Sequence, residues 1–124
     1  MKSYIKYELP IFSSSLINNP VVKPEDMNII LELTGFDEKD KLKKIIIQFN
    51  SVVCYKYTLA GFTPKLYNSY DKIVELKESE WLQELKNINQ EKFSYWKPSH
   101  YIIYLDEVGM FQFIAKGYEV TEYE

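Results

Sequence analysis

The chain contains no arginine. Its cationic residues are 15 lysines, which stand against 18 acidic residues and give a net charge of −3. Duplex nucleic acid favours a concentrated positive surface, and base recognition relies heavily on the bidentate guanidinium group. The absence of arginine also weakens the case for bidentate recognition of phosphate or carboxylate groups. The composition therefore argues against nucleic acid as a partner.

Cysteine and histidine each occur once, as Cys54 and His100. A single cysteine cannot form an internal disulfide, so we expect a reducing, cytoplasmic environment. Cys54 and His100 are the only pair available to a cysteine nucleophile. The alternating residues around Cys54 favour a small core residue instead, and His100 is expected to form a hydrogen bond at the start of a strand.

Residue types that bind metals and nucleotides are also scarce. One histidine and one cysteine cannot form a zinc site without carboxylates. Four scattered glycines do not form a phosphate-binding loop. We therefore expect no metal, no cofactor and no enzymatic activity.

Long hydrophobic runs are missing as well. No apolar run approaches the ~18 residues of a membrane span. The first eight residues alternate polar with apolar side chains and include an acid, which is unlike a signal peptide. We expect a cytoplasmic protein without a membrane partner. Its hydrophobic content of 46% is sufficient for the core of one domain over residues 1–124.

Alternating apolar and polar residues predict six to eight short strands. The predicted strands cover residues 3–9, 28–34, 42–49, 52–58, 72–77, 100–105 and 110–115, with an edge segment over 118–123. Proline, serine and asparagine predict a loop over residues 10–27, and further loops are expected over 59–71 and 93–98. Asn50 and Ser51 predict a bend or bulge between two strands.

One helix is predicted over residues 80–90. Ser79 is a suitable N-cap, and Trp81, Leu85 and Ile88 form an apolar stripe. Strands joined by short hairpins indicate an antiparallel sheet. We therefore expect a single α+β domain with a strongly twisted, mainly antiparallel sheet that can curl partway to a barrel. The helix at about 80–90 is expected on one face of the sheet.

Aromatic residues are abundant, with 11 tyrosines. The tyrosines of the strands exceed what a core of this size can hold, so several are expected at an interface or along a groove. Cross-strand pairing in the sheet is the alternative explanation. Tyrosines and acids come together at one predicted turn and along the C-terminal edge, with a second cluster in the aromatic loop. The candidate partner-binding residues are Tyr104, Asp106, Glu107, Tyr118, Glu119, Glu122, Tyr95 and Trp96.

Two stretches carry a resemblance to known proteins. One is Glu78–Leu82, which follows the predicted strand Ile73–Leu76. The other is His100–Asp106, which continues through Gly109 to Phe113–Ala115. Together they resemble small uncharacterised bacterial cytosolic proteins of the immunity type, which are partners of secreted toxins. The resemblance covers about residues 45–120 and implies a protein partner, such as a basic toxin domain. Its motifs imply no functional residues.

The leading hypothesis is a non-enzymatic protein-binding module of the immunity type that neutralises a toxin partner. The alternative is a small-ligand-binding domain with an aromatic pocket between sheet and helix. The sequence does not indicate the oligomeric state.

Overall fold

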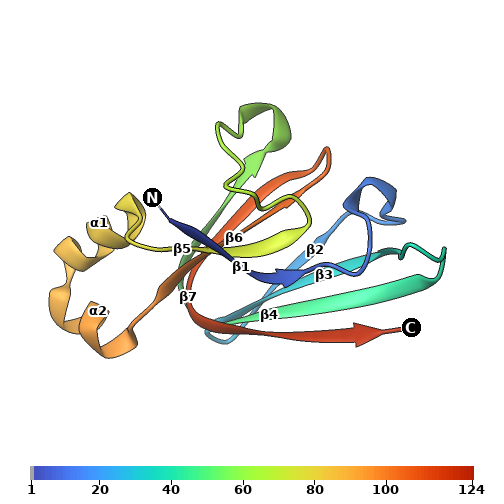
Figure 1. Cartoon of the computed structure of the whole chain (residues 1–124). Helices are drawn as coiled ribbons and strands as arrows, with labels where there is room; N and C mark the ends of the chain where they lie inside the picture. Colours follow the sequence, from blue (N-terminus) through green and yellow to red (C-terminus); the bar gives the residue numbers. More distant parts are fainter. Residues whose placement is uncertain (1) are drawn as a thin grey trace.

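The computed structural model describes residues 2–124 and contains one seven-stranded antiparallel sheet in the order β1-β5-β6-β7-β4-β3-β2 (Figure 1). The strands are β1 (Ser3–Glu8), β2 (Val21–Glu25), β3 (Asn28–Phe36), β4 (Leu42–Leu59), β5 (Lys72–Leu76), β6 (Ser99–Leu105) and β7 (Gly109–Tyr123). Two helices, α1 (Glu80–Ile88) and α2 (Gln90–Trp96), lie between β5 and β6. Two 3₁₀ turns, η1 (Ser13–Ser15) and η2 (Ala60–Phe62), interrupt the loops.

A shared bend in the two longest strands shapes the sheet. β4 and β7 pair along nearly their whole lengths, and Asn50 lies opposite Gly117 where the bend occurs. Next to it, Ser51 has a positive φ of 49°, and the register shifts between Val52 and Cys54. Such bulges bend a strand and increase its twist. The sequence correctly indicated a bend at this point, but it predicted two strands where the structure has one.

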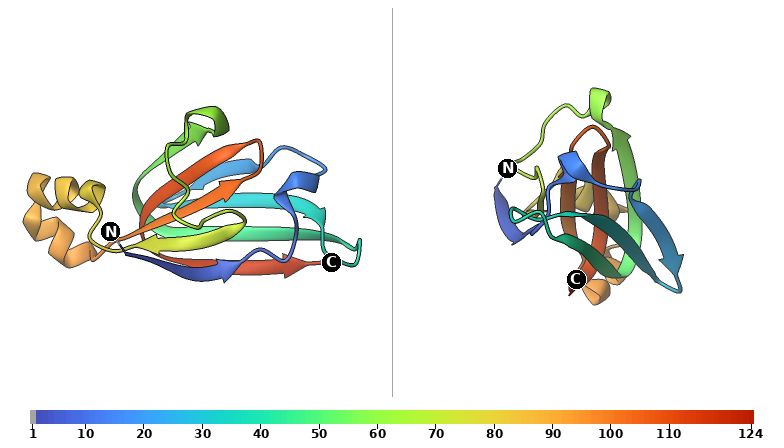
Figure 2. Two further views of the ribbon diagram at one scale, coloured as in Figure 1. Left: turned by 45° about the horizontal axis from the view of Figure 1, so that its top comes forward. Right: turned by 90° about the vertical axis from the view of Figure 1, so that its right-hand side faces the viewer.

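The bend folds the sheet into two layers that face each other (Figure 2). The first layer contains β1, β5, β6, the first half of β7 (109–115) and the second half of β4 (52–59). The second layer contains the second half of β7 (117–123), the first half of β4 (42–50), β3 and β2. The sheet is not closed, because β1 and β2 remain its outer strands.

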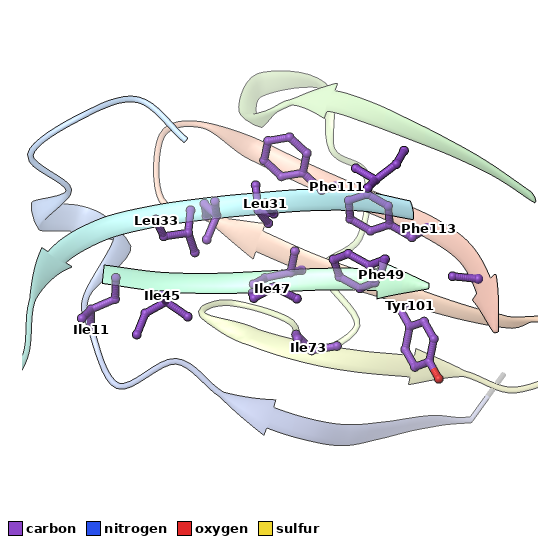
Figure 3. Close-up of a cluster of buried hydrophobic side chains, with 14 residues drawn as sticks. Ile11, Leu31, Leu33, Ile45, Ile47, Phe49, Ile73, Tyr101, Phe111 and Phe113 are labelled. Carbon is purple, nitrogen blue, oxygen red and sulfur yellow. The ribbon is translucent and has the colours of Figure 1, made fainter. Parts of the chain in front are cut away.

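The main hydrophobic core fills the space between the two layers (Figure 3). Its centre is a stacked pair of rings, Phe49 and Phe113, whose centroids lie 3.9 Å apart. The second layer contributes Leu31 and Ile47, and the first layer contributes Ile103. Burial of apolar area at about 25 cal/mol per Å² makes this core the principal source of stability. A smaller cluster around Ile102 and Met110 lies on the outer face of the first layer.

The open side next to β1 is bridged by tyrosine hydroxyls. Tyr7 of β1 donates a hydrogen bond to Oε2 of Glu122 in β7, with the two oxygens 2.7 Å apart. Tyr118 of β7 donates to the backbone carbonyl of Lys6 at 3.2 Å. These contacts hold the two layers together on that side without a backbone ladder.

The α+β class and the twisted antiparallel sheet are confirmed, but the position of the helix differs from the prediction. Both helices project from one end of the sheet instead of covering a face (Figures 1 and 2). No residue of α1 is fully buried, and Ile88 is exposed. Helix α2 was predicted as a loop. Asn89 ends α1 and also caps α2, because its side chain accepts a hydrogen bond from the backbone N–H of Lys92.

Strand β2 was also missed, because it lies in the proline-rich segment that predicted a loop. Pro24 is part of β2 and lies opposite Ile29 of β3. Proline withholds a backbone donor, which an outer strand tolerates because one of its sides has no ladder.

We predict that Gly109→Ala destabilises the protein by about 2 kcal/mol or more. Gly109 has a φ of 138°, and a Cβ atom there would lie 2.1 Å from the carbonyl oxygen of Thr58. The substitution therefore adds backbone strain to a collision with β4. Gly117→Ala is the matched control, because a Cβ atom there meets nothing within 4 Å. Urea unfolding measures both. Equal stability of the two variants would contradict the predicted role of Gly109.

Candidate functional site

The second half of β4 has a strand neighbour on one side only. Its residues from Cys54 to Leu59 pair with β7. On the other side, pairing with β3 ends at Phe49, opposite Ile29. At the bend the backbone N–H of Val52 still bonds to the carbonyl of Met27, at 2.8 Å. Beyond that point, no described strand flanks residues 53–59, and we call this segment the open edge.

One side of the open edge faces a cleft between the two layers. Four half-exposed apolar side chains lie along the open edge: Val53, Tyr55, Tyr57 and Leu59 are 47, 47, 46 and 53% exposed. The last three of these line a cleft of about 600 Å³, which we call the aromatic cleft. The opposite wall comes from β2 and the segment before it, through Pro20 and Val22.

The aromatic wall of the cleft is held in place by the β6–β7 hairpin. The hydroxyl of Tyr57 donates a hydrogen bond to the carbonyl of Val108. Its ring lies 4.9 Å from that of Phe111, and the ring of Tyr55 is stacked 6.1 Å from Phe113. These contacts fix the two tyrosines against the buried core, so the wall is formed before any partner arrives.

The predicted turn residues Asp106 and Glu107 lie between β6 and β7, and they differ in accessibility. Glu107 is exposed and lines the aromatic cleft. Asp106 is half-buried, and its backbone N–H donates to Oγ of Ser13 at 2.8 Å. Burial, followed by hydrogen bonding with Asp106, raises the pKa of Tyr70 to about 12. Asp106 is therefore engaged within the protein, whereas Glu107 is available to a partner.

The predicted tyrosines Tyr104 and Tyr118 lie on opposite faces of the sheet. Tyr104 packs on the smaller outer cluster, and its ring is 6.0 Å from that of Tyr70. Tyr118 packs against the main core, with its ring 5.4 Å from that of Tyr101. The structure does not bring these two residues into one patch.

The predicted acids of β7 lie in its second half. Glu119 and Glu122 are both exposed, and Glu122 accepts the hydrogen bond from Tyr7 described above. They belong to the second layer, whereas the Asp106–Glu107 turn belongs to the first. The acids predicted to act together are therefore distributed over both layers.

The predicted aromatic pair of α2 lies at a different place again. Tyr95 is exposed, and Trp96 is half-buried with its ring 6.1 Å from that of Tyr95. Trp96 lines an apolar groove of about 330 Å³ between the helices and the bend of β4. The other apolar residues of this helix groove are Met27, Val52, Val53, Leu85, Ile88, Phe93 and Pro98.

His100 is buried in a hydrogen-bonded chain that connects the start of α1 to the sheet. Its Nδ1 lies 2.8 Å from Oγ of Ser79, and its Nε2 lies 2.8 Å from Oε1 of Gln112. Because Gln112 offers a carbonyl oxygen, the proton of the neutral ring is on Nε2, and Ser79 donates to Nδ1. Ser79 also accepts the N–H of Leu82 as the helix cap. Both nitrogens of His100 are thus engaged without Cys54, whose thiol has a pKa raised by burial.

Residues 2–124 contain neither a candidate metal-binding cluster nor a helix that could span a membrane. No group of three or more histidine, cysteine, aspartate or glutamate residues there is placed to hold a metal ion. No helix in the same range is long and apolar enough to cross a membrane. No protein-family model, curated protein sequence or solved structure matches the chain.

The aromatic cleft is the feature that the sequence only partly indicated. The alternation placed Val53, Tyr55 and Tyr57 on one side of a strand and predicted surplus tyrosines at a surface or groove. Nothing in the chain indicated that β3 would leave β4 at the bend. The open edge therefore follows from the topology, and it was missing from the predicted site.

We predict that stability falls between pH 7.5 and pH 5.5 through His100. Burial is the largest effect that lowers the pKa of His100 below its ordinary value of about 6.5. The unfolded chain therefore binds a proton in this range before the folded protein does, and stability is lost as the pH falls. Urea unfolding of the wild type and His100→Gln at both pH values measures the difference. Because His100 is the only histidine, NMR titration of its ring gives a direct check. A ring that titrates at or above pH 6.5 would contradict the prediction.

Proposed function

We propose that the protein is a non-enzymatic protein-binding module and that the aromatic cleft is its binding surface. The observation that carries this proposal is the row of half-exposed apolar residues on the open edge. Tyrosine provides a large, rigid contact area with a polar tip, which is why it is enriched at interfaces. The cleft volume of about 600 Å³ is sufficient for several apolar side chains of a partner.

The narrower form of this proposal is an immunity-type protein that neutralises a basic toxin domain. It is supported by the resemblance of residues 45–120 and by the net charge of −3, which favours encounter with a basic partner over long range. Glu107 is the acid best placed to contribute at the surface, because it is exposed at the cleft. Asp106 is less suited, because its turn is bonded to Ser13.

A display library of random twelve-residue peptides tests the proposal. We expect the wild type to enrich peptides with micromolar affinity and Tyr55→Lys to lose at least tenfold in affinity for them. The substitution places a charge on the apolar wall, and a partner would have to desolvate it. Titration calorimetry measures the affinities.

Tyr4→Lys is the matched control, because Tyr4 is 45% exposed, close to the 47% of Tyr55, and lies on β1. We expect its affinity to stay within twofold of the wild type. Failure to enrich any peptide, or equal losses in both variants, would overturn the assignment of the cleft as a protein-binding surface.

The helix groove supports a second candidate function, the binding of a small apolar ligand. Its volume of about 330 Å³ lies at the lower end of the range for ligand sites. Trp96 and Phe93 supply aromatic walls, and Leu85 supplies an aliphatic one. This groove is the place where the alternative hypothesis from the sequence, a small-ligand-binding domain with an aromatic pocket, would apply.

Thermal denaturation with small apolar probes distinguishes the second candidate from the first. A ligand that binds only the folded state raises the melting temperature with its concentration. Under the ligand hypothesis, indole and naphthalene should raise the melting temperature of the wild type but not of Leu85→Lys, which places a charge in the groove. Identical melting curves with and without probe would remove the helix groove from consideration.

A further inference from the structure

The open edge offers unpaired backbone groups to a partner. In an antiparallel sheet, successive residues direct their N–H and C=O groups alternately to the two neighbouring strands. Residues 53–59 have β7 on one side and no described strand on the other. Alternate residues of this segment therefore present a donor and an acceptor outward, except that the carbonyl of Leu59 already accepts a hydrogen bond from Oγ1 of Thr63 at 3.2 Å. Such an edge is a template for pairing with another extended chain.

The other outer strands carry features that oppose pairing, whereas the open edge has few. Strand β2 contains the consecutive residues Lys23, Pro24 and Glu25, and proline and charge both hinder the addition of a strand. Strand β1 is hydrogen-bonded to β7, because the hydroxyl of Tyr7 donates to Glu122 and the hydroxyl of Tyr118 donates to the backbone carbonyl of Lys6. The open edge has the sequence VCYKYTL, without proline or glycine, and Lys56 is its only charged residue.

The aromatic cleft determines which side chains are needed in a partner strand that is added beside the open edge. A strand added beside the open edge lies between β4 and the opposite wall of the cleft, because Tyr57 and Val22 line the same space. Its alternate side chains would enter the cleft, which requires apolar residues at every second position. Seven residues at about 3.4 Å each give a strand of about 24 Å.

Lys56 determines the charge that is favoured on the face of the added strand that points away from the cleft. Its side chain lies on the outer face of β4, with Nζ 4.5 Å from the ring centroid of Trp81. Glu80 and Glu84 line the same outer pocket, yet none of the ion pairs found in residues 2–124 includes Lys56. An acid directly opposite Lys56 on an added strand would form a favourable cross-strand pair, for which the ammonium group would turn from the ring of Trp81 toward the open edge.

A second copy of the chain fits this edge less well. Antiparallel pairing of two open edges about Lys56, the central residue of the segment, would place two ammonium groups directly opposite each other. Like charges in that position destabilise a sheet. The charge on the edge therefore favours a different chain with an acid at this position.

We propose that the protein binds its partner by strand addition: an extended partner segment pairs with residues 53–59 of β4, inserts alternate apolar side chains into the aromatic cleft, and places an acidic side chain opposite Lys56. This inference rests on the proposed function and specifies the kind of segment that is bound. Main-chain hydrogen bonds supply affinity in this mode, and the pockets for alternate side chains supply specificity.

A scan of N-methylated peptides tests strand addition. The tightest peptide from the display selection is synthesised with a single N-methyl group at each position in turn, and its affinity for the wild type is measured. We expect losses of at least tenfold at alternate positions, where the amide donates to the open edge, and changes below threefold between them. Uniform tolerance of N-methylation would overturn strand addition but leave protein binding at the cleft intact. Absence of any selected peptide would overturn both.

A charge exchange tests the acid opposite Lys56. We expect the selected peptides to carry aspartate or glutamate between two apolar positions, and replacement of that acid by lysine to weaken binding about fivefold. Lys56→Glu should recover the affinity for the lysine peptide. Lys86→Glu is the control, because Lys86 is exposed in the last turn of α1, and it should not recover the affinity. Recovery by both variants or by neither would overturn this register.

Light scattering tests whether a second copy of the chain occupies the open edge. We expect a monomer at 100 µM for the wild type. A dimer that dissociates in Tyr55→Lys would assign the open edge to a second copy and would overturn the proposal of a foreign partner.

Discussion

The shared bend of β4 and β7 is the constraint on which the rest of the structure depends. The two strands pair on both sides of the bend, so neither can turn without the other. A sheet with one apolar face must bury that face against another layer, and in most α+β domains this layer consists of helices. Here the helices lie beyond the end of the sheet. The bend replaces them by folding the second layer over the first, and Phe49 meets Phe113 at the centre of the core so formed.

The same bend creates the candidate site. Strand β3 follows β4 only as far as Phe49 and does not continue around the bend. The second half of β4 thereby loses its neighbour while its side chains keep their alternation. In the first half, Ile45 and Ile47 are covered by the opposite layer, whereas Tyr55 and Tyr57 of the second half face the cleft. Core and cleft are therefore successive parts of one face of one strand.

The sequence predicted those parts of the fold that depend on local patterns. The two short apolar runs over residues 100–105 and 110–115 located the strands of the β6–β7 hairpin, and the residues at the bend were recognised as an interruption. Strand β2 was missed because proline is a loop signal unless the strand is known to be an outer one. The apolar stripe of α1 predicted docking on a sheet face, but a buried chain from Ser79 through His100 holds the helix at the end of the sheet.

The candidate site was less predictable, because it depends on which strands become neighbours. Tyr104 and Asp106 are close in sequence, but the first packs outward and the backbone of the second is bonded to Ser13. Glu107 is the one predicted residue that reaches the aromatic cleft, because its hairpin ends beside the last residues of β4. Proximity in the sequence therefore identified the turn that carries Glu107, but it did not indicate the aromatic cleft that this turn helps to line.

The rigidity of the cleft wall affects the energetics of binding. An exposed apolar edge carries a risk of aggregation, and Lys56 is its only charged residue. Tyr57 is held by the carbonyl of Val108 and by the ring of Phe111, so it does not have to be ordered when a partner arrives. Immobilising a side chain at an interface costs about 0.5–1.5 kcal/mol, and a preformed wall avoids much of this cost. The remaining ordering cost falls on the partner segment, so segments that already favour an extended conformation should bind most tightly.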